Sequence, residues 1–279
     1  MPQIPLIPSP PAAPERLAEL ASSLRLPTIA DELARRLLAA GHDDALAIVL
    51  DVFEMEAQDR RERRIERLRR ASHLPPGKTF ATLNLDRYPR PLVAKIRELA
   101  RGGFIDRSDN ILAFGLPGVG KSHVACAIGH ALVEAGRSVF FTPTYKIVQE
   151  LLAAKRDLGL PSTLRKLDAF DVVILDDIGY VKQNADEVEV LFTLMSDRYE
   201  RRSLVITSNL LFSNWDQIFK NPMTTAAAID RVVHHSAILE FPKSSFRAEE
   251  ALKRAKGQAA EPANPPPEEP SPASPSPRA

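Results

Sequence analysis

Residues 110–122 read Asn-Ile-Leu-Ala-Phe-Gly-Leu-Pro-Gly-Val-Gly-Lys-Ser, a short apolar run that leads into a glycine-rich loop. The loop has the form G-x-x-x-x-G-K-[ST], in which glycines allow consecutive backbone N–H groups to turn toward phosphate oxygens. A helix-like apolar run, 124–133, follows the loop, and the N-terminus of a helix also favours an anion. The alternative is a glycine-rich turn before an ordinary helix. The strand–loop–helix context favours a nucleotide-binding loop.

Two side chains of this loop would carry the phosphate chemistry. Lys121 places a positive charge against the β- and γ-phosphates, and the Ser122 hydroxyl is a ligand for Mg²⁺. The sequence therefore predicts ATP and Mg²⁺ as cofactors. The residues expected to contact the nucleotide are Gly115, Pro117, Gly118, Val119, Gly120, Lys121, Ser122 and His123.

Two carboxylates follow a second apolar run, 172–175. A buried strand here would deliver Asp176 and Asp177 to the carboxyl edge of a parallel sheet, where open α/β folds bind ligands. We expect Asp176 to hold Mg²⁺ through water, and Asp177 to polarise the attacking water. A strand that ends in an ordinary acidic turn is the alternative, and the phosphate loop in the same chain favours the functional interpretation.

Two further residues are candidates for roles in or near the site, and a histidine pair is considered as metal ligands. Asn209 ends another apolar run and could orient the attacking water, although Asn also favours turns. Arg231 is either a surface arginine or a finger that reaches the γ-phosphate bound by a neighbouring subunit. The pair His234 and His235 is expected to be a packing or surface feature, because no Cys or acidic residue lies at metal-ligand spacing.

Length and composition limit the class of protein. The chain has 279 residues, 44% of them hydrophobic, which is enough for one core domain and a smaller accessory unit. The single cysteine, Cys126, excludes an intrachain disulfide and fits a reducing cytoplasm. The sequence shows neither a bilayer-spanning apolar run nor a signal peptide, so we expect a cytoplasmic protein that does not bind membranes. Because the net charge is only +1, nucleic-acid binding must be argued from where the charges lie.

Beyond the loop, apolar strand-like runs alternate with helix-like segments. This alternation is typical of an α/β fold in which helices cover both faces of a parallel sheet. Strands are expected at 111–114, 138–142, 172–176, 203–207 and 237–241, and helices at 92–101, 124–133, 145–155 and 187–199.

Composition also divides the chain into four parts. Both ends are rich in proline and cannot build a packed core, so we expect disordered tails at 1–14 and 257–279. Leucines at helical spacing predict a small all-α domain over 15–74, in which Thr28 to Asp31 forms a capping box at the start of the second helix. A proline-containing linker ends near residue 77, and the ATPase domain is expected over 78–256.

The third helix of the all-α domain ends in an arginine-rich run, residues 60–70. A solvated or protein-binding helix face is one interpretation, supported by the i,i+4 pairs Glu56–Arg60, Asp59–Arg63 and Glu66–Arg70. The arginines outnumber their acidic partners, however, and each guanidinium can release a counterion from a phosphate backbone. We therefore expect contacts with double-stranded DNA that do not depend on base sequence, made by Arg60, Arg63, Arg64 and Arg67.

Six stretches of the chain together resemble the IstB-like ATP-binding proteins, the ATPase helpers of insertion-sequence transposases. The resemblance extends over about Leu17 to Lys253. The phosphate loop marks only a superfamily, whereas the runs around Tyr199 and His235 are more specific. The stretches that carry it are Gly115–His123, Asp176–Tyr180, Arg198–Ser203, Thr207–Asn209, Trp215 and Ile229–Ser236.

This resemblance implies an AAA+ module of the initiator and helicase-loader clade, with a five-stranded sheet ordered 5-1-4-3-2. It implies oligomers that form on DNA with ATP and that stimulate a partner transposase. It also implies that Asn209 is the first sensor residue, Arg231 the arginine finger and Arg247 a second sensor. In this clade an extra helical segment after the second strand approaches DNA, which adds the candidates Lys155, Arg156, Arg165 and Lys166.

The chain departs from the family pattern in two places. The family commonly has Glu after the first Walker B aspartate, whereas this chain has Asp177, which is shorter by one methylene and would slow hydrolysis without preventing binding. The usual Gly-Glu-Ser-Tyr-Arg motif appears as Pro-Lys-Ser-Ser-Phe-Arg, residues 242–247.

Three other functions compete with the transposition helper. A DnaC-type loader of the replicative helicase shares the ATPase core and differs in the partner of its N-terminal helices. A small-molecule P-loop kinase would need a lid and an acceptor pocket, and the paired aspartates and Asn209 argue against it. The third alternative is a DNA-binding scaffold that uses ATP only as a signal for assembly.

Overall fold

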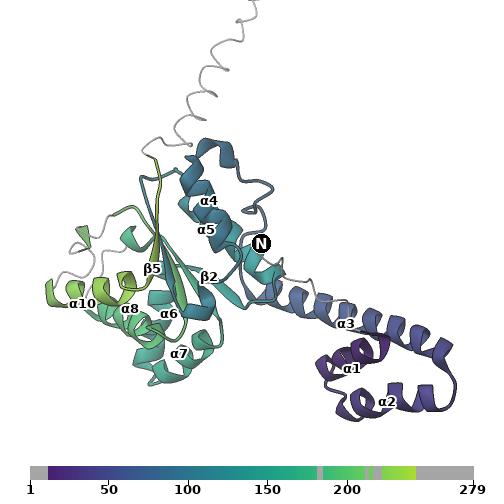
Figure 1. Cartoon of the computed structure of the whole chain (residues 1–279). Helices are drawn as coiled ribbons and strands as arrows, with labels where there is room; N and C mark the ends of the chain where they lie inside the picture. Colours follow the sequence, from purple (N-terminus) through teal and green to yellow (C-terminus); the bar gives the residue numbers. More distant parts are fainter. Residues whose placement is uncertain (1–11, 181–184, 211–213, 216–221, 243–279) are drawn as a thin grey trace, which may run out of the picture.

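The structure is a computed structural model that describes residues 12–180, 185–210, 214–215 and 222–242. An α/β body and a group of N-terminal helices make up the described chain (Figure 1). The expected tail at 257–279, nearly all of the tail at 1–14, and Arg247 lie outside the described residues.

A five-stranded parallel sheet forms the centre of the body. Its order is β2-β3-β4-β1-β5, which confirms the predicted order 5-1-4-3-2. All five strands begin and end within one residue of their predicted limits, because apolar runs mark buried strands well. The strands are β1 (Asn110–Phe114), β2 (Val139–Pro143), β3 (Val172–Asp176), β4 (Ser203–Ser208) and β5 (Ser236–Glu240).

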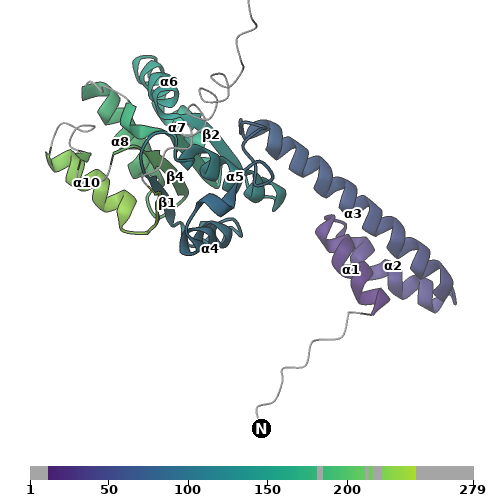
Figure 2. The same cartoon turned by 90° about the horizontal axis from the view of Figure 1, so that it is seen from above.

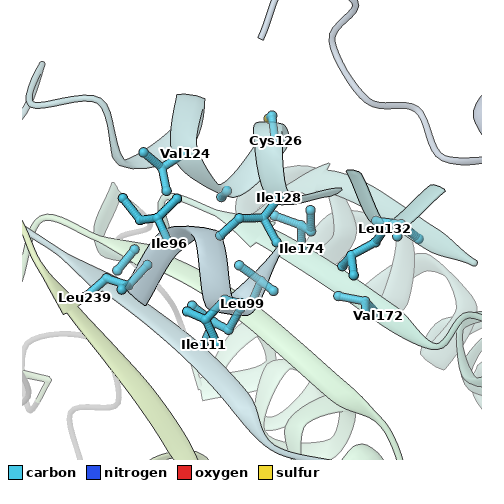
Figure 3. Close-up of a cluster of buried hydrophobic side chains, with 14 of the residues drawn as sticks. Ile96, Leu99, Ile111, Val124, Cys126, Ile128, Leu132, Val172, Ile174 and Leu239 are labelled. Carbon is cyan, nitrogen blue, oxygen red and sulfur yellow. The ribbon is translucent and has the colours of Figure 1, made fainter. Parts of the chain in front are cut away.

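Helices cover both faces of the sheet, and alternate residues of β1 point to the two layers. Ile111 packs under α4 (Arg90–Leu99) and α5 (Lys121–Glu134), in the cluster drawn in Figure 3. Leu112 and Phe114 face the opposite layer. That layer contains α6 (Thr144–Arg156), α7 (Leu160–Asp168), α8 (Ala185–Arg198) and α10 (Pro222–Val233) (Figure 2). Short 3₁₀ helices lie at Leu85–Arg87, Ile105–Arg107 and Ile178–Tyr180.

The N-terminal helices are α1 (Ala13–Ser23), α2 (Pro27–Ala39) and the long α3 (Asp43–Ala71). A small apolar cluster around Leu17, Ala34 and Leu46 holds α1 and α2 against the half of α3 that lies away from the body (Figure 2). The predicted capping box was wrong. The second helix begins at Pro27, because proline is well suited to the first helical position, and no side chain caps it.

The last turns of α3 are packed against the body. The buried Ser72 that follows α3 accepts a backbone hydrogen bond of 2.7 Å from Phe141 of β2. An ion pair of 2.7 Å joins Arg69 to Glu134 at the end of α5. Leu74 then enters the core above Gly129, where an added Cβ would lie 3.0 Å from the Leu74 side chain. The segment where a linker is expected is therefore packed, which sets the direction in which α3 leaves the body.

The run Arg198–Ser203 has a structural role. The Arg198 guanidinium is buried and donates hydrogen bonds to backbone carbonyl oxygens of Leu167 and Phe170, at 2.9 Å each, and of Ser203, at 3.1 Å. Burial lowers the pKa of Arg198 to about 10. This side chain thus ties the end of α8 to the end of α7 and the start of β4.

The single cysteine and the lengths of the helices both bear on what the composition predicted. Cys126 is fully buried, and burial raises the pKa of its thiol to about 12, so the thiol is an inert core group. Among the helices of the described ranges, none combines the length and the apolar character that crossing a bilayer requires.

Candidate nucleotide-binding site

The phosphate loop lies between the end of β1 and the start of α5. Gly118 has a φ of 83° and Gly120 a φ of 96°, which side chains with a Cβ adopt only with strain. Gly120 is the N-cap of α5, and Lys121 is the first residue of that helix. Backbone N–H groups of the loop and the N-terminus of α5 therefore converge, as an anion site requires.

Gly115, the first loop glycine, is required for space as well as for conformation. Its φ is 156°, and an added Cβ would lie 2.8 Å from Cβ of Phe241 and 3.1 Å from a methyl of Val119. Phe241 follows β5, the edge strand beside β1. The loop is thus packed directly against the chain that leaves the sheet.

We predict that Gly115→Ala destabilises the protein by about 1–3 kcal/mol, through overpacking and backbone strain, and weakens ATP binding. Gly136→Ala is the matched control, because Gly136 also has a positive φ, 82°, but nothing lies within 4 Å of an added Cβ. Urea unfolding and ATP titration of both variants test this. Equal effects of the two substitutions would contradict the packing argument.

Lys121 is held at the centre of the site. Its side chain is nearly buried, with a residue exposure of 6%. Its ammonium group donates to the backbone oxygens of Gly115 at 2.8 Å and Leu116 at 2.9 Å, and to Oδ1 of Asn209 at 2.6 Å. The charge is therefore positioned by the loop itself and by the end of β4.

A hydrogen-bonded chain connects Lys121 to the aspartate pair. Nδ2 of Asn209 donates to Oδ1 of Asp177 at 3.0 Å. The hydroxyl of Thr207 donates to Oδ1 of Asp176 at 2.7 Å and accepts from the backbone N–H of Asp177 at 2.8 Å. Asp177 has a φ of 62°, a left-handed conformation that turns it out of the strand direction. Three predicted site residues, Lys121, Asp177 and Asn209, are thus brought together.

Two threonines of this arrangement were not identified from the sequence. Thr207 is completely buried and holds both aspartates, and the hydroxyl of Thr144 donates to the backbone oxygen of Asp176 at 3.0 Å. In the sequence Thr207 was part of the stretch 207–209 that carries the family resemblance, but no role was assigned to it. Its role depends on the parallel pairing of β3 with β4, which that stretch does not reveal.

Two hollows flank the phosphate loop. One, of about 410 Å³, contains the acidic and amide groups and is lined by Pro117, Gly118, Lys121, Ser122, Pro143, Tyr145, Asp176, Asp177, Thr207 and Asn209. The other, of about 290 Å³, opens toward the segment before α4. It is lined by Lys78, Thr82, Leu83, Asn84, Arg87, Tyr88, Gly118, Gly120, Lys121, Ser122 and His123. The residues at 78–88 carried no sequence motif and were missed.

The segment 78–88 is attached to the loop through two side chains. Nε2 of His123 lies 3.1 Å from the backbone oxygen of Thr79 and 3.1 Å from the Thr82 hydroxyl. The Tyr88 hydroxyl donates to the backbone oxygen of Val119 at 3.1 Å, and burial raises the pKa of Tyr88 to about 12. His123 therefore orders the wall of the second hollow, and Tyr88 supports the loop from behind.

Arg231 does not line either hollow. It lies in the last turn of α10, and its guanidinium sits 4.9 Å from the centre of the Phe192 ring on α8. Its Nη1 is buried and has no hydrogen-bond partner among the described residues. The Arg231 side chain therefore packs on α8 of its own subunit and lies outside both hollows beside its own phosphate loop.

The basic residues predicted to contact DNA differ in their surroundings. Arg60 is paired with Glu56 and donates to the backbone oxygen of Leu24, and Arg64 donates to the backbone oxygen of Gly136. Lys155 is bound to Glu189 at 2.8 Å and to Asp186 at 3.2 Å, and both raise its pKa. Exposed side chains are found at Arg63, Arg67, Arg156, Arg165 and Lys166.

An open groove of about 1010 Å³ runs along the arginine-rich part of α3. Six arginines and two glutamates line it, so its formal charge is strongly positive. Arg25, from the turn between α1 and α2, forms part of the wall and was not a candidate from the sequence. The complete lining is Arg25, Arg60, Glu62, Arg63, Arg64, Glu66, Arg67 and Arg70.

The residues present fit a magnesium–nucleotide complex. Gly118 and Gly120 hold the loop in left-handed backbone conformations that favour glycine, and the nearly buried ammonium group of Lys121 is bonded to the loop. Hydroxyl and carboxylate oxygens, the ligands that Mg²⁺ prefers, come from Ser122, Asp176 and Asp177 in the same hollow.

Several known proteins are similar to this chain in sequence. The chain matches the family of IstB-like ATP binding protein over residues 19–254. An insertion sequence ATP-binding protein of Sinorhizobium fredii (strain NBRC 101917 / NGR234) is 43% identical over 250 residues, which cover 88% of this chain and 84% of that protein. The IS5376 ATP-binding protein of Geobacillus stearothermophilus is 32% identical over 238 residues, which cover 85% of this chain and 95% of that protein.

Solved structures share the AAA+ fold at low sequence identity. The crystal structure of DnaI has a TM-score of 0.51 and 17% identity, and the match covers 61% of this chain and 96% of that chain. AMPPCP-bound DnaA from Aquifex aeolicus has a TM-score of 0.52 and 16% identity over 68% of this chain and 58% of that chain. At such identities these structures support the fold alone. From the extent of the sequence match, the chain belongs to the IstB-like ATP binding protein family.

Proposed function

We propose that this protein is an AAA+ ATPase that assembles on double-stranded DNA with ATP and assists the transposase of an insertion sequence. The observation that carries the proposal is the linked set Lys121, Asn209 and Asp177 within one hollow beside the phosphate loop. A binding site alone needs only the loop and its lysine. The amide and the second carboxylate are what a hydrolytic site adds.

Each side chain has a definite task in this proposal. Bound Mg²⁺–ATP supplies the phosphoanhydride bond to be broken and a metal that neutralises the phosphate charge. Lys121 would exchange its bonds to the loop carbonyls and to Oδ1 of Asn209 for bonds to phosphate oxygens, and this exchange would free the amide oxygen. Asn209 and Asp177 remain within hydrogen-bonding distance of each other; Asn209 would orient a water, and the Asp177 carboxylate would accept its proton. Arg231 acts on the site of a neighbouring subunit.

The transposase is proposed as partner because of the relatives. Relatives that are similar in sequence over most of the chain carry names that place them in insertion sequences, in organisms as different as Sinorhizobium and Geobacillus. A DnaC-type helicase loader is the second candidate that the sequence left open, and the fold shared with DnaI does not discriminate between the two functions. The reading frame beside the gene distinguishes the two, since a transposase gene supports the first and replication genes support the second.

DNA binding is proposed for the arginine-lined groove along α3. Arg63 and Arg67 are exposed there, and the hydrogen bond of Arg63 to the backbone oxygen of Asp59, at 3.2 Å, stays within α3. Arg60 and Arg64, in contrast, each donate to a backbone oxygen outside α3. Neither Arg63 nor Arg67 has a short ion pair, because the Arg63–Glu56 separation is 3.6 Å and Arg67 forms no salt bridge with a residue in the described ranges. Such a groove binds the phosphate backbone and does not read bases.

We predict that the double variant Arg63→Ala, Arg67→Ala weakens binding to unrelated duplexes equally. The slope of log K against log salt should fall by about two units, roughly 0.9 for each lost phosphate contact. The control is Arg35→Ala, Arg36→Ala, which removes two exposed charges from α2, outside the groove. Filter binding over a salt series measures both. An unchanged slope in the groove variant would show that α3 does not contact DNA.

A further inference from the structure

A cluster of metal-binding side chains lies at the sheet edge opposite the nucleotide. Glu200 is in the turn between α8 and β4, and His234 and His235 form the turn between α10 and β5. Both turns enter strands that flank β1, so parallel pairing brings them together at the amino end of the sheet. The sequence gives no hint of this, because Glu200 is more than 30 residues away from the histidines. Spacing along the sequence, on which the interpretation of the pair as a packing or surface feature was based, could not reveal this acidic neighbour, and both imidazoles are exposed.

The geometry of the cluster approaches that of a metal centre. Nε2 of His235 lies 3.7 Å from Oε1 of Glu200, and the two imidazole rings have centroids 4.1 Å apart at an angle of 67°. One donor atom from each of the three residues lies within 4.8 Å of the other two. Donors around a four-coordinate Zn²⁺ are separated by about 3.3–3.5 Å, as bond lengths of about 2.0–2.1 Å require. The three side chains are exposed, so they can close by about 1 Å without repacking the core.

The backbone that carries these ligands is fixed. The carbonyl oxygen of His235 accepts a hydrogen bond of 2.7 Å from the backbone N–H of Asn110 in β1, and the backbone N–H of His234 donates to the backbone oxygen of Asp230 at 3.0 Å. The Tyr199 hydroxyl lies 3.5 Å from Nδ1 of His234, in position to orient that ring. A fixed backbone lowers the entropy that ion binding must overcome.

The ligand set selects the class of ion. Two imidazole nitrogens and one carboxylate oxygen suit Zn²⁺ and its neighbours in the transition series. Mg²⁺ and Ca²⁺ prefer oxygen ligands, so the Mg²⁺ of the nucleotide site would not compete here. An ordinary exposed ion pair between His235 and Glu200 is the competing explanation, and such a pair contributes little to stability.

We propose that Glu200, His234 and His235 bind one Zn²⁺ ion and leave a fourth coordination position open. The bound ion joins the turn after α8 to the turn after α10. Arg231 lies one helical turn before the histidines, so the ion also fixes the end of the helix that bears this arginine. The site is separate from nucleotide binding and does not depend on the proposed ATPase function.

The test is a Zn²⁺ titration of the full chain, without a polyhistidine tag and without nucleotide, in competition with a chromogenic chelator. We expect one Zn²⁺ per chain, a rise in Tm on binding, and a visible absorption spectrum typical of four-coordinate Co²⁺ when Co²⁺ is the probe. Glu200→Gln and His235→Ala should each lower the affinity roughly tenfold or more and remove the Zn²⁺-dependent rise in Tm. Glu200→Gln changes only an exposed side chain and keeps the test valid if His235→Ala fails to fold.

Two control variants locate the ion. His42→Ala removes an exposed imidazole at the start of α3 and should leave Zn²⁺ affinity unchanged. Asp176→Asn should also leave it unchanged, because Asp176 lines the nucleotide hollow. Failure of the unaltered protein to bind Zn²⁺, or affinity that survives both ligand substitutions, would overturn the proposal. Loss of binding in Asp176→Asn alone would assign the ion to the nucleotide site and overturn it equally.

Discussion

Lys121→Ala is expected to lower ATP affinity by about 100-fold, whereas Asp177→Asn should leave ATP affinity nearly unchanged. The lysine supplies charge-assisted bonds to phosphate oxygens, each worth about 1.5–3 kcal/mol. The aspartate does not hold the nucleotide, so replacing it should reduce turnover by about 10²–10⁴ while binding persists. Fluorescent-nucleotide titration measures affinity, and phosphate release measures turnover.

Controls separate these effects from damage to the fold. Lys146→Ala removes an exposed lysine of α6 and should change neither quantity. Removing Lys121 leaves the carbonyls of Gly115 and Leu116 without its ammonium group, so circular dichroism and urea unfolding must accompany the titration. Undiminished ATP affinity in Lys121→Ala would contradict the loop assignment. Equal loss of binding in both variants would contradict the division of roles.

Arg231→Ala is expected to reduce turnover by about 10³–10⁵ with little change in ATP affinity, because a finger stabilises charge that develops only during phosphoryl transfer. Arg231 is outside both hollows of its own subunit, as a residue that acts on a neighbour would be. Mixing therefore provides a direct test. Lys121→Ala subunits still offer Arg231, and Arg231→Ala subunits still bind ATP. Some interfaces of a mixed oligomer would combine an intact loop with an intact finger, so activity should partly return.

A second variant distinguishes the loss of the arginine finger from the loss of the packing contact between Arg231 and Phe192. Arg231 stacks over Phe192, and losing this contact alone would cost about 0.5–1 kcal/mol of stability. Phe192→Leu removes the ring but keeps the arginine, and it should retain most of the turnover. If the two inactive variants co-assemble on DNA by light scattering yet stay inactive together, Arg231 does not act in trans.

The sequence predicted the features that depend on short stretches. The phosphate loop, the strand that ends in Asp176 and the alternation of strands and helices all leave local patterns, and the sheet order followed from the family resemblance. The ends of elements were less accurate. The strand expected at 138–142 lies at 139–143. It continues to Pro143, and α6 begins at the next residue.

Features that depend on distant residues could not be predicted. Thr207 holds two aspartates that lie about 30 residues earlier, and only the pairing of β3 with β4 explains this. The wall formed by residues 78–88 and the meeting of Glu200 with His235 arise in the same way. Arg198 looked like part of a family signature, and its buried bonds to backbone carbonyls identify a structural reason for it.

The rate of phosphate release with and without duplex DNA tests the proposed function most directly. The measurement compares the unaltered protein with Asp177→Asn at equal subunit concentration, with ATP and Mg²⁺ in excess. The proposal predicts that the unaltered protein releases phosphate, that duplex DNA of any sequence raises the rate per subunit, and that Asp177→Asn lowers both rates by about 10²–10⁴. ATP binding without phosphate release at any DNA concentration, or a rate that DNA does not change, would contradict a DNA-assembled ATPase.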